Sequence, residues 1–331
     1  MNPEVFQNFK KLLEESRGRK IAVAGHMRPD GDCVASQFAM REILSASGAQ
    51  AVVCVNKNEV PHLYKNLAPL PLENSETFDL SGWDIVLVDC SDFSRVSDTL
   101  GERAGGKIFA CIDHHASGAS TAEINCIDIC AGATAEIIAL CVGELGLKIS
   151  PVIANLLFTG LATDTRQFTT TSTRRESFDA AKTLVECGAN PNAVAQELYQ
   201  RERPEKMALL AIYLGSLKSY CNGRVRVGFL TQKSFENTGA KKEDTDGLVD
   251  FARAIEGVEI AATLEELADG SVKGSVRGRF PQYEVNKIAE SFGGGGHLAA
   301  AGFTAKNENF NTIMPKFIEL CRKSLEKYER I

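Results

Sequence analysis

The sequence is short of the features that mark membrane-spanning, secreted and disulfide-linked proteins. No apolar run approaches the roughly 20 residues of a membrane span. The amphipathic start MNPEVFQNFKKLLEES lacks the continuous apolar core of a signal peptide. The ten cysteines are scattered and include no CxxC pair. We therefore expect a cytoplasmic protein with buried thiols, without disulfides or a structural zinc site.

The chain also lacks a net positive charge, because 43 Asp and Glu outnumber 37 Lys and Arg and the formal net charge is -6. A protein that wraps long DNA or RNA usually presents a basic face, so we expect no long nucleic acid and no membrane as partner. A small anionic ligand held by a few local cations is compatible with this balance. The 331 residues, 44% of them hydrophobic, are enough for two domains with their own cores.

The first half of the chain alternates short apolar runs with helix-like segments. The runs cover 20–25, 51–56, 84–90, 107–113 and 122–128, and the helical patterns cover 33–48, 133–146, 150–165 and 173–188. This alternation predicts an α/β fold with a mostly parallel sheet covered on both faces. The pattern changes after residue 188. We predict a first domain over 1–188, a linker helix over 189–222 and a smaller α/β domain over 223–331.

Imidazoles and carboxylates stand where the apolar segments of the first domain end. They are His26, Asp30, Asp32, Asp89, Asp113, His114, His115 and Asp164. In open α/β sheets the ligand site lies outside the carboxyl ends of the strands. Each residue alone is more simply a turn or a helix cap. Together they hold three of the chain's five histidines, so we expect one shared site.

The residue types in this set indicate a metal. Carboxylates with a few imidazoles and no thiolate favour Mn²⁺ or Mg²⁺ over structural zinc. Two such ions about 3.5–4 Å apart can clamp the attacking and leaving oxygens of a phosphoryl displacement. Such a pair needs one carboxylate that bridges both ions.

A second signal lies in the run FGGGGH, which ends in His297. It is either a flexible loop or a backbone segment that something approaches closely. We expect the free N–H groups of Gly294, Gly295 and Gly296 to bind an anion, with a hydrogen bond from His297. Upstream, Arg277 and Arg279 alternate on a strand and face one side, which suits phosphate. Two exposed arginines are more often merely solubilising, so this pair gains weight only from the glycine run.

The motifs HMRPDGD, VDC, DHH and ATDT, in this order, resemble those of the DHH phosphoesterase superfamily. SVRGR followed by FGGGGHLAAAG resembles the DHHA1 domain that often follows. The resemblance covers nearly the whole chain and is strongest to the stand-alone oligoribonuclease and 3'-phosphoadenosine 5'-phosphate phosphatase type. Two positions depart from the usual pattern: Ala35 stands where glycine is common, and so does Arg166. No ligand position is lost.

The resemblance implies a role for each motif residue. One metal ion would be held by His26, Asp30 and Asp89. The second would be held by Asp32, Asp89, His114 and Asp164, with Asp89 as the bridge. Asp113 would orient a ligand, and His115 would face the scissile phosphate and assist the leaving group or stabilise charge. Arg277, the glycine run and His297 would hold the terminal nucleotide across a cleft between the domains, where the active site would lie.

These roles imply a Mn²⁺-dependent phosphoesterase, with Mg²⁺ as the alternative ion. It would hydrolyse short RNA or DNA oligonucleotides to mononucleotides and 3'-phosphoadenosine 5'-phosphate to AMP, through a metal-bridging hydroxide. A homodimer is suggested by the resemblance alone.

Several rivals stay open. They are a cyclic or linear di-AMP phosphodiesterase, a processive exonuclease, an inorganic pyrophosphatase and a non-hydrolytic nucleotide-binding module. The exonuclease would need a longer chain, and the pyrophosphatase a different second domain. The binding module would be expected to lose metal ligands.

Overall fold

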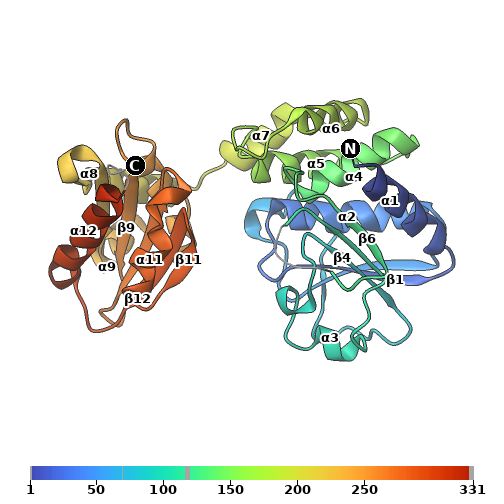
Figure 1. The fold of residues 1–331 in the computed structure, drawn as a ribbon, viewed down its shortest axis with the longest axis horizontal. Coiled ribbons are helices and arrows are strands. Elements are labelled where there is room, and N and C mark those ends of the chain that lie inside the picture. The colour runs from blue at the N-terminus through green and yellow to red at the C-terminus, as the bar shows by residue number, and fades with distance from the viewer. Residues whose placement is uncertain (1, 69, 116–119, 328–331) are drawn as a thin grey trace. The chain divides into compact units, whose positions relative to one another are not determined.

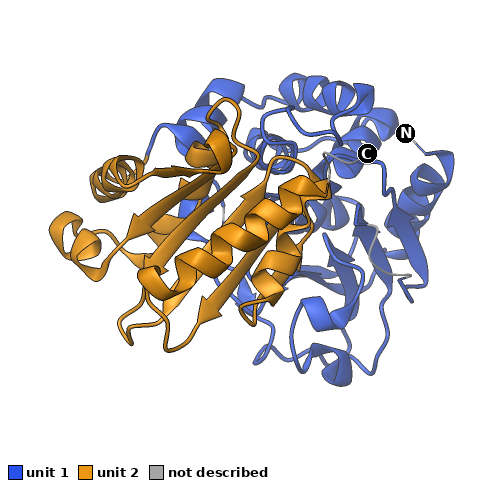
Figure 2. Cartoon of the chain, turned by 60° about the vertical axis from the view of Figure 1, so that its left-hand side comes forward, with its two compact units in different colours: residues 1–201 blue, residues 202–331 orange. Residues whose placement is uncertain are grey.

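The computed structural model describes residues 2–68, 70–115 and 120–327. Two compact units divide the chain, unit 1 over Met1–Arg201 and unit 2 over Glu202–Ile331 (Figure 2). Their boundary falls inside the segment 189–222 that was expected to be a linker helix. Each unit has its own sheet and its own hydrophobic cores.

Unit 1 is built on a six-stranded sheet in which every neighbouring pair is parallel. Its strands are β1 (Lys20–Gly25), β2 (Ala51–Asn56), β3 (Glu73–Asn74), β4 (Asp84–Val88), β5 (Ala110–Asp113) and β6 (Ile124–Ile127). Their order is β3-β2-β1-β4-β5-β6. The chain builds outward from β1 and then returns to add β4 on its other side. The point between β1 and β4 is therefore the topological switch point, where open α/β sheets bind ligands.

Helices cover one face of this sheet (Figure 1). They are α1 (Pro3–Glu15), α2 (Gly31–Ala46), α4 (Thr134–Leu145) and α5 (Pro151–Asp164), with α6 (Arg175–Glu186) and α7 (Pro191–Tyr199) packed outside them. The other face carries a second apolar cluster under α3 (Leu100–Arg103) and a 3₁₀ turn over Phe93–Arg95. The predicted α/β class and parallel sheet are confirmed. The second face is covered by short turns and loops more than by helices.

A buried ion network joins α4 to α6. Glu136 of α4 is fully buried, and its Oε1 accepts a hydrogen bond of 2.7 Å from Arg174. Arg174 also bonds Asp128 at 2.7 Å. The other carboxylate oxygen of Glu136 accepts from Ser177 Oγ and from the backbone N–H of Gly132. The network therefore anchors the loop 128–133, which leads from β6 into α4.

Unit 2 is a mixed sheet of order β11-β12-β10-β9-β8-β7, in which only the β8–β9 pair is parallel. The strands are β7 (Lys218–Tyr220), β8 (Val225–Leu230), β9 (Ile260–Glu266), β10 (Val272–Gly278), β11 (Gly295–His297) and β12 (Ala300–Ala305). Helices α11 (Val285–Glu290) and α12 (Phe310–Glu326) cover one face. Helices α8 (Pro204–Gly215) and α10 (Leu248–Arg253) pack on the other, and α9 (Gln232–Thr238) packs beside α8.

The segment 189–222 is not the single helix that was expected. It contains α7, α8 and the strand β7. Pro204 begins a new helix, because proline lacks the backbone N–H that a continuous helix would need at that point. Helix α8 ends at Gly215, and Lys218–Tyr220 pairs with β8. The hairpin between β9 and β10 turns at Asp269-Gly270, with Gly270 at φ +79°.

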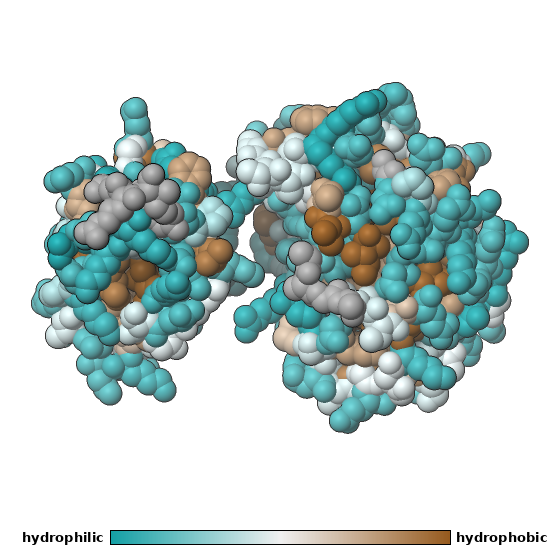
Figure 3. All heavy atoms as spheres, viewed as in Figure 1, coloured by the Kyte–Doolittle hydropathy of each residue, from teal (hydrophilic) through white to brown (hydrophobic). Residues whose placement is uncertain are grey.

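Hydrophilic residues cover most of the face shown in Figure 3 in both units, and hydrophobic residues gather in smaller patches. Among the described residues, no helix has the length and apolar character needed to span a membrane.

We expect Arg174→Met to destabilise unit 1 by about 3–5 kcal/mol, because it leaves the buried Glu136 carboxylate without its cation. Urea unfolding followed by the fluorescence of Trp83, the single tryptophan, measures this. Arg175→Met is the matched control, since that neighbouring side chain is 88% exposed. Equal stability of the two variants would show that the network contributes little.

Candidate metal centre

All eight candidate residues of unit 1 lie at the carboxyl edge of its sheet. His26 follows β1, Asp89 follows β4, and His114 and His115 follow β5, whose last residue is Asp113. Asp30 caps α2, with its Oδ1 accepting from Cys33 N, and Asp32 lies in the first turn of that helix. Asp164 is the last residue of α5. The expected convergence at the switch point is therefore present in the structure.

Asp89 stands at the centre of the group and is 1% exposed. Its Oδ2 lies 3.3 Å from His26 Nε2, and its Oδ1 lies 3.6 Å from His114 Nε2. The two oxygens of one carboxylate thus face two different imidazoles. This is the geometry that a bridging carboxylate requires.

The other carboxylates divide between these two imidazoles. Asp30 Oδ1 lies 3.7 Å from His26 Nε2. On the other side, His114 Nε2 has Asp164 Oδ2 at 3.3 Å and Asp32 Oδ2 at 4.0 Å. The result is two sets of possible metal ligands that share Asp89, in the same grouping that the resemblance implies.

The orientation of both imidazoles suits cations. His26 Nδ1 lies 3.0 Å from the carbonyl of Met27, and His114 Nδ1 lies 3.2 Å from the carbonyl of Ala131. Each ring therefore turns Nε2 toward the carboxylates. His114 Nε2 is buried and has no hydrogen-bond partner among the described residues. A nitrogen that faces three carboxylates must carry a proton or bind a cation, so the residues present fit bound metal ions.

The pKa values in the cluster point to the same excess of negative charge. Burial disfavours a charged imidazole at His114, but Asp164, Asp32 and Asp89 outweigh it and raise its pKa to about 10. Burial likewise opposes charge at His26, yet the nearby carboxylates of Asp30 and Asp89 hold its pKa above the usual range. Burial, with repulsion from Asp89 and Asp164, raises the pKa of Asp32 well above its usual range. The cluster therefore attracts positive charge.

The thiol of Cys33 lies among these groups but is a poor metal ligand. A ligand atom of Cys33 lies within 4.8 Å of ligand atoms of His26 and Asp89. The side chain is fully buried, and burial raises the pKa of the thiol to about 12. Only the thiolate binds metal well. Asp30 is therefore the better third donor beside His26.

His115 is oriented differently from the other two imidazoles. Its Nδ1 lies 2.8 Å from Asp113 Oδ1, and its side chain is 42% exposed. The same Oδ1 accepts from the backbone N–H groups of His114 and His115. Asp113 therefore fixes the turn after β5 and holds the His115 ring with Nε2 directed away from it. Asp113 thus contacts the side chain of His115 and the backbone of the candidate ligand His114.

Helix α4 supplies contacts that sequence reasoning missed. The backbone N–H groups of Thr134 and Ala135 donate to the two oxygens of Asp32 at 2.6 and 2.8 Å. Thr134 Oγ1 donates to Asp89 Oδ1 at 3.0 Å. The first turn of α4 thus holds two of the candidate ligands and stabilises their charge. A threonine at the start of an apolar helix was the only available signal.

Backbone strain is concentrated around the cluster. Asp89 has φ +59°, and Arg28, beside His26, has φ +57°. Arg166, Gln167 and Phe168 follow Asp164 with φ values of +45°, +60° and +62°. Left-handed conformations are costly for residues other than glycine, and they gather at functional sites. The position of Arg166 explains why glycine is common there in the motif that this sequence resembles.

In unit 2, the strand register places Arg277 and His297 on one face of the sheet. Arg277 lies opposite Ala300 on β12, which in turn lies opposite His297 on β11. Residues directly opposite in antiparallel strands project to the same face. Val276 packs into the core with α11 and α12, so its neighbour Arg277 projects to the other face. Only the small side chain of Ala300 separates the two.

Arg279 does not join them. Its guanidinium donates to the carbonyls of Val258, Arg253 and Ile255 at 2.8, 3.3 and 3.2 Å. These bonds tie β10 to the carboxyl end of α10 and to the chain that follows. We therefore withdraw Arg279 from the predicted phosphate-binding set, because its donors already serve a structural role.

Only part of the glycine run could offer the free N–H groups that were expected, because its first residues are bonded within unit 2. The N–H groups of Gly293 and Gly294 cap α11, and Gly295–His297 forms the edge strand β11. A Cβ on Gly294 would lie 2.1 Å from the carbonyl oxygen of Gly302. Gly296 has φ +144°. These two glycines allow β11 to approach β12, whereas Gly295 faces open space.

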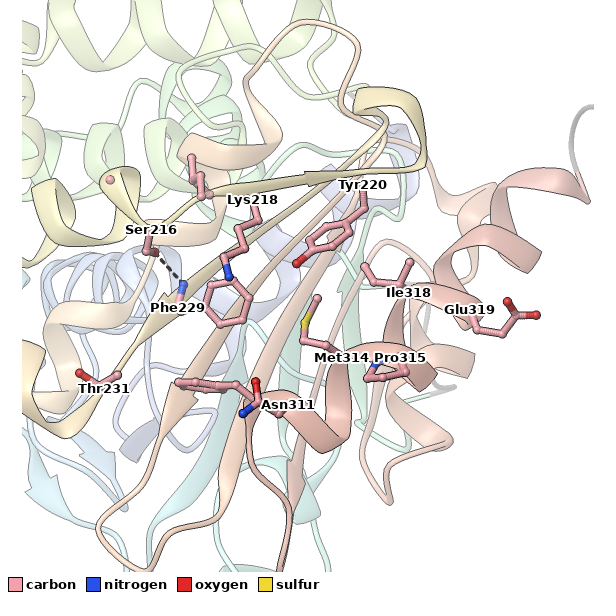
Figure 4. A pocket seen from close by; sticks show the side chains of 13 residues that line it. Ser216, Lys218, Tyr220, Phe229, Thr231, Asn311, Met314, Pro315, Ile318 and Glu319 are labelled. Atoms are coloured by element: carbon pink, nitrogen blue, oxygen red, sulfur yellow. Dashed lines mark hydrogen bonds between the residues drawn. The ribbon is translucent and has the colours of Figure 1, made fainter.

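A large groove lies elsewhere in unit 2. A groove of about 990 Å³ is lined by apolar and aromatic side chains of β7, β8 and α12. Figure 4 shows Lys218 reaching over the ring of Phe229, with Tyr220 and Met314 nearby. The groove contains none of the candidate residues.

Comparison with known proteins agrees with this arrangement. The model for the N-terminal domain of the DHH family matches residues 20–161, and the DHHA1 domain model matches residues 222–323. The bifunctional oligoribonuclease and PAP phosphatase NrnA of Thermus thermophilus is 28% identical over 93% of this chain and 90% of that protein. A probable manganese-dependent inorganic pyrophosphatase of Staphylococcus aureus is 30% identical over 50% of this chain and 54% of that protein.

The solved structure of an exopolyphosphatase-related protein from Bacteroides fragilis shares the fold. Its TM-score is 0.83 at 23% identity, over 98% of this chain and 96% of that one. The fold and the site define a hydrolase that acts on phosphate ester bonds. The chain belongs to the DHH family, with a DHHA1 domain in its second unit.

In the presence of a chelator, we expect Asp164→Asn to be more stable than the wild type by about 0.5–2 kcal/mol, as functional residues often limit stability. Burial, with repulsion from Asp30 and Asp89, raises the pKa of this carboxyl, so removing its charge relieves the cluster. Urea unfolding at constant pH measures the difference. Asp179→Asn, on the exposed face of α6, is the control. A less stable Asp164→Asn would mean that the cluster is not under repulsion.

Proposed function

We propose that this chain hydrolyses short oligonucleotides to mononucleotides and 3'-phosphoadenosine 5'-phosphate to AMP, with two divalent ions in unit 1. The observation that carries the proposal is the Asp89 carboxylate, whose two oxygens face His26 Nε2 and His114 Nε2. The activities for which the Thermus thermophilus relative is named support the choice of substrates. Mn²⁺ is the proposed ion, because the donors are carboxylates and imidazoles.

The residues that would hold the ions follow from the two donor sets. One ion would be held by His26, Asp30 and Asp89. The other would be held by Asp32, Asp89, His114 and Asp164. When bound, such a pair stabilises the charge of the phosphoryl oxygens and lowers the pKa of a shared water, so that hydroxide can attack near neutral pH.

The remaining roles belong to side chains of this chain. His115 presents Nε2 and is held through Nδ1 by Asp113, so it would protonate or stabilise the leaving oxygen of the substrate. Arg277 and His297 share a face of the second sheet and would bind the terminal nucleotide. The side chain of Arg277 has only a backbone carbonyl of its own strand as a hydrogen-bond partner among the described residues. Its remaining donors suit a phosphate.

A di-AMP phosphodiesterase would use the same metal chemistry, and a binding module would use none. We would incubate the protein, with Mn²⁺ and with chelator, with short RNAs, 3'-phosphoadenosine 5'-phosphate, linear and cyclic diadenylate, long single-stranded DNA and pyrophosphate. Fast metal-dependent release of mononucleotides from the short RNAs is the expected result. A strong preference for cyclic diadenylate would favour the phosphodiesterase. No hydrolysis by folded, metal-loaded protein would favour the binding module.

Asp89→Asn should weaken Mn²⁺ binding by more than the roughly 10–100-fold loss typical of changes behind the ligands, and should abolish hydrolysis. Asparagine tolerates the φ of +59° at this position, so the fold should be kept. Calorimetric titration with Mn²⁺ measures the affinity, and circular dichroism checks the fold. Wild-type affinity in this variant would remove Asp89 from the metal centre.

Arg277→Ala should affect substrate binding, whereas Arg279→Ala should affect stability. We expect Arg277→Ala to raise KM for a dinucleotide about tenfold, since one charge-assisted contact is lost, and to leave the melting temperature unchanged. Arg279→Ala should lower the melting temperature, because three carbonyls lose their donor, and should leave KM unchanged. The reverse pattern would indicate that Arg279, and not Arg277, binds the substrate.

A further inference from the structure

A small polar pocket opens beside the metal centre of unit 1 and has no role in the scheme above. It has a volume of about 260 Å³. Asp89, Asp113 and His115 form the wall it shares with the centre, and Ser91, Asp92, Ser94 and Arg95 line the rest. Pockets that enclose a drug-sized ligand measure about 300–1,000 Å³. This pocket therefore suits one part of a nucleotide and not a whole dinucleotide.

Arg95 is the feature that suggests a ligand. Its side chain is exposed, and no described residue forms a hydrogen bond or ion pair with its guanidinium. Its backbone is fixed, because its carbonyl accepts from Met27 N at 2.6 Å and Asp92 caps the 3₁₀ turn that contains it. Met27 follows the candidate ligand His26. The backbone that carries this unpartnered guanidinium is thus tied to the segment that follows His26.

The acidic residues that line the pocket form no ion pair with Arg95, which is therefore available to bind an anion. Asp89 faces the imidazoles of the centre, and the Oδ1 of buried Asp113 accepts three N–H donors. Hydrogen bonds from Ser94 lower the pKa of Asp92, so that carboxylate is ionised. It accepts from hydroxyl groups and repels phosphate. A ligand that carries both sugar hydroxyls and a phosphate matches this division, with its phosphate at Arg95.

The chemistry of the proposed function names such a ligand. In 3'-phosphoadenosine 5'-phosphate and in the dinucleotide pApA, water attacks phosphorus and the bond from phosphorus to a 3'-oxygen breaks. That oxygen keeps the bonding electron pair and takes a proton. The group that leaves is adenosine 5'-phosphate in both reactions. Since His115 assists the leaving oxygen and also lines the pocket, the leaving nucleotide extends into it.

We propose that this pocket binds the ribose 5'-phosphate of the leaving nucleotide, with Arg95 on its 5'-phosphate. The proposal rests on the proposed function and adds a specificity determinant to it. It predicts a preference for substrates whose leaving nucleotide carries a 5'-phosphate. The scissile phosphate itself is left to the metal centre.

The test measures each variant on pairs of substrates that differ only in the 5'-phosphate of the leaving nucleotide. The substrate pairs are 3'-phosphoadenosine 5'-phosphate with adenosine 3'-phosphate, and pApA with ApA. We expect Arg95→Ala to lower kcat/KM about tenfold or more for the first member of each pair, the loss typical of a charge-assisted hydrogen bond, and less than about twofold for the second. Arg95→Lys should recover part of the loss, because it keeps the charge.

Two controls separate this contact from a general effect of charge. Arg28→Ala removes another exposed arginine, next to His26, and Arg175→Ala removes a distant one on α6; neither should change the ratio within a pair. Inhibition of the wild type by AMP should also weaken in Arg95→Ala, while inhibition by adenosine should not. This second measurement reports binding without turnover.

The outcomes are distinguishable. Equal losses on both members of each pair, or a ratio that changes in Arg28→Ala instead, would overturn the role of Arg95. A wild type that hydrolyses neither pair would overturn the proposed function itself, and this inference with it. Because the Arg95 side chain has no described partner, the variant should keep the urea midpoint of the wild type. Should Arg95→Ala fail to fold, Arg95→Gln tests the same charge.

Discussion

The structure of unit 1 depends on one carboxylate held between two imidazoles. Asp89 is buried at the switch point of a parallel sheet, and each of its oxygens faces a different histidine. Its left-handed backbone turns the chain sharply at the end of β4. The strand order determines this meeting, because β1 and β4 are neighbours although more than fifty residues separate them.

Successive layers of contacts offset the repulsion among the carboxylates of the cluster. The first turn of α4 donates backbone N–H groups to Asp32 and the hydroxyl of Thr134 to Asp89. The loop before α4 is anchored in turn by Glu136 and Arg174, which lie outside the cluster. Hydrogen bonds alone leave the repulsion only partly compensated, as the raised pKa values of Asp32 and His114 show. Bound cations would complete the compensation, and this would link the stability of the fold to its chemistry.

Sequence reasoning predicted the α/β class and the convergence of the motif residues, because both follow from period and order along the chain. An apolar run that ends in Asp113-His114-His115 is a strand that delivers side chains to one edge of a sheet. Contacts that depend on tertiary packing could not be predicted from the sequence. Thr134, Ala131 and Arg95 contact or border the centre from segments without a motif.

The same limit explains two of the differences between expectation and structure. Alternation on a strand placed Arg279 beside Arg277, but it could not show that three carbonyls near α10 take up the guanidinium of Arg279. Four glycines in a row indicated close approach of something to the backbone. What approaches Gly294 and Gly296 is β12 of the same sheet. Residue spacing therefore predicts the face of the sheet on which a side chain lies, but the contacts of that side chain depend on the fold.

Electron paramagnetic resonance of the Mn²⁺-loaded protein would show whether two ions share Asp89. Two Mn²⁺ ions about 3.5–4 Å apart, joined by one carboxylate, are magnetically coupled. We expect a coupled spectrum at two ions per chain, which Asp89→Asn converts to that of isolated ions or abolishes. A spectrum of isolated Mn²⁺ in the wild type at saturation would contradict it.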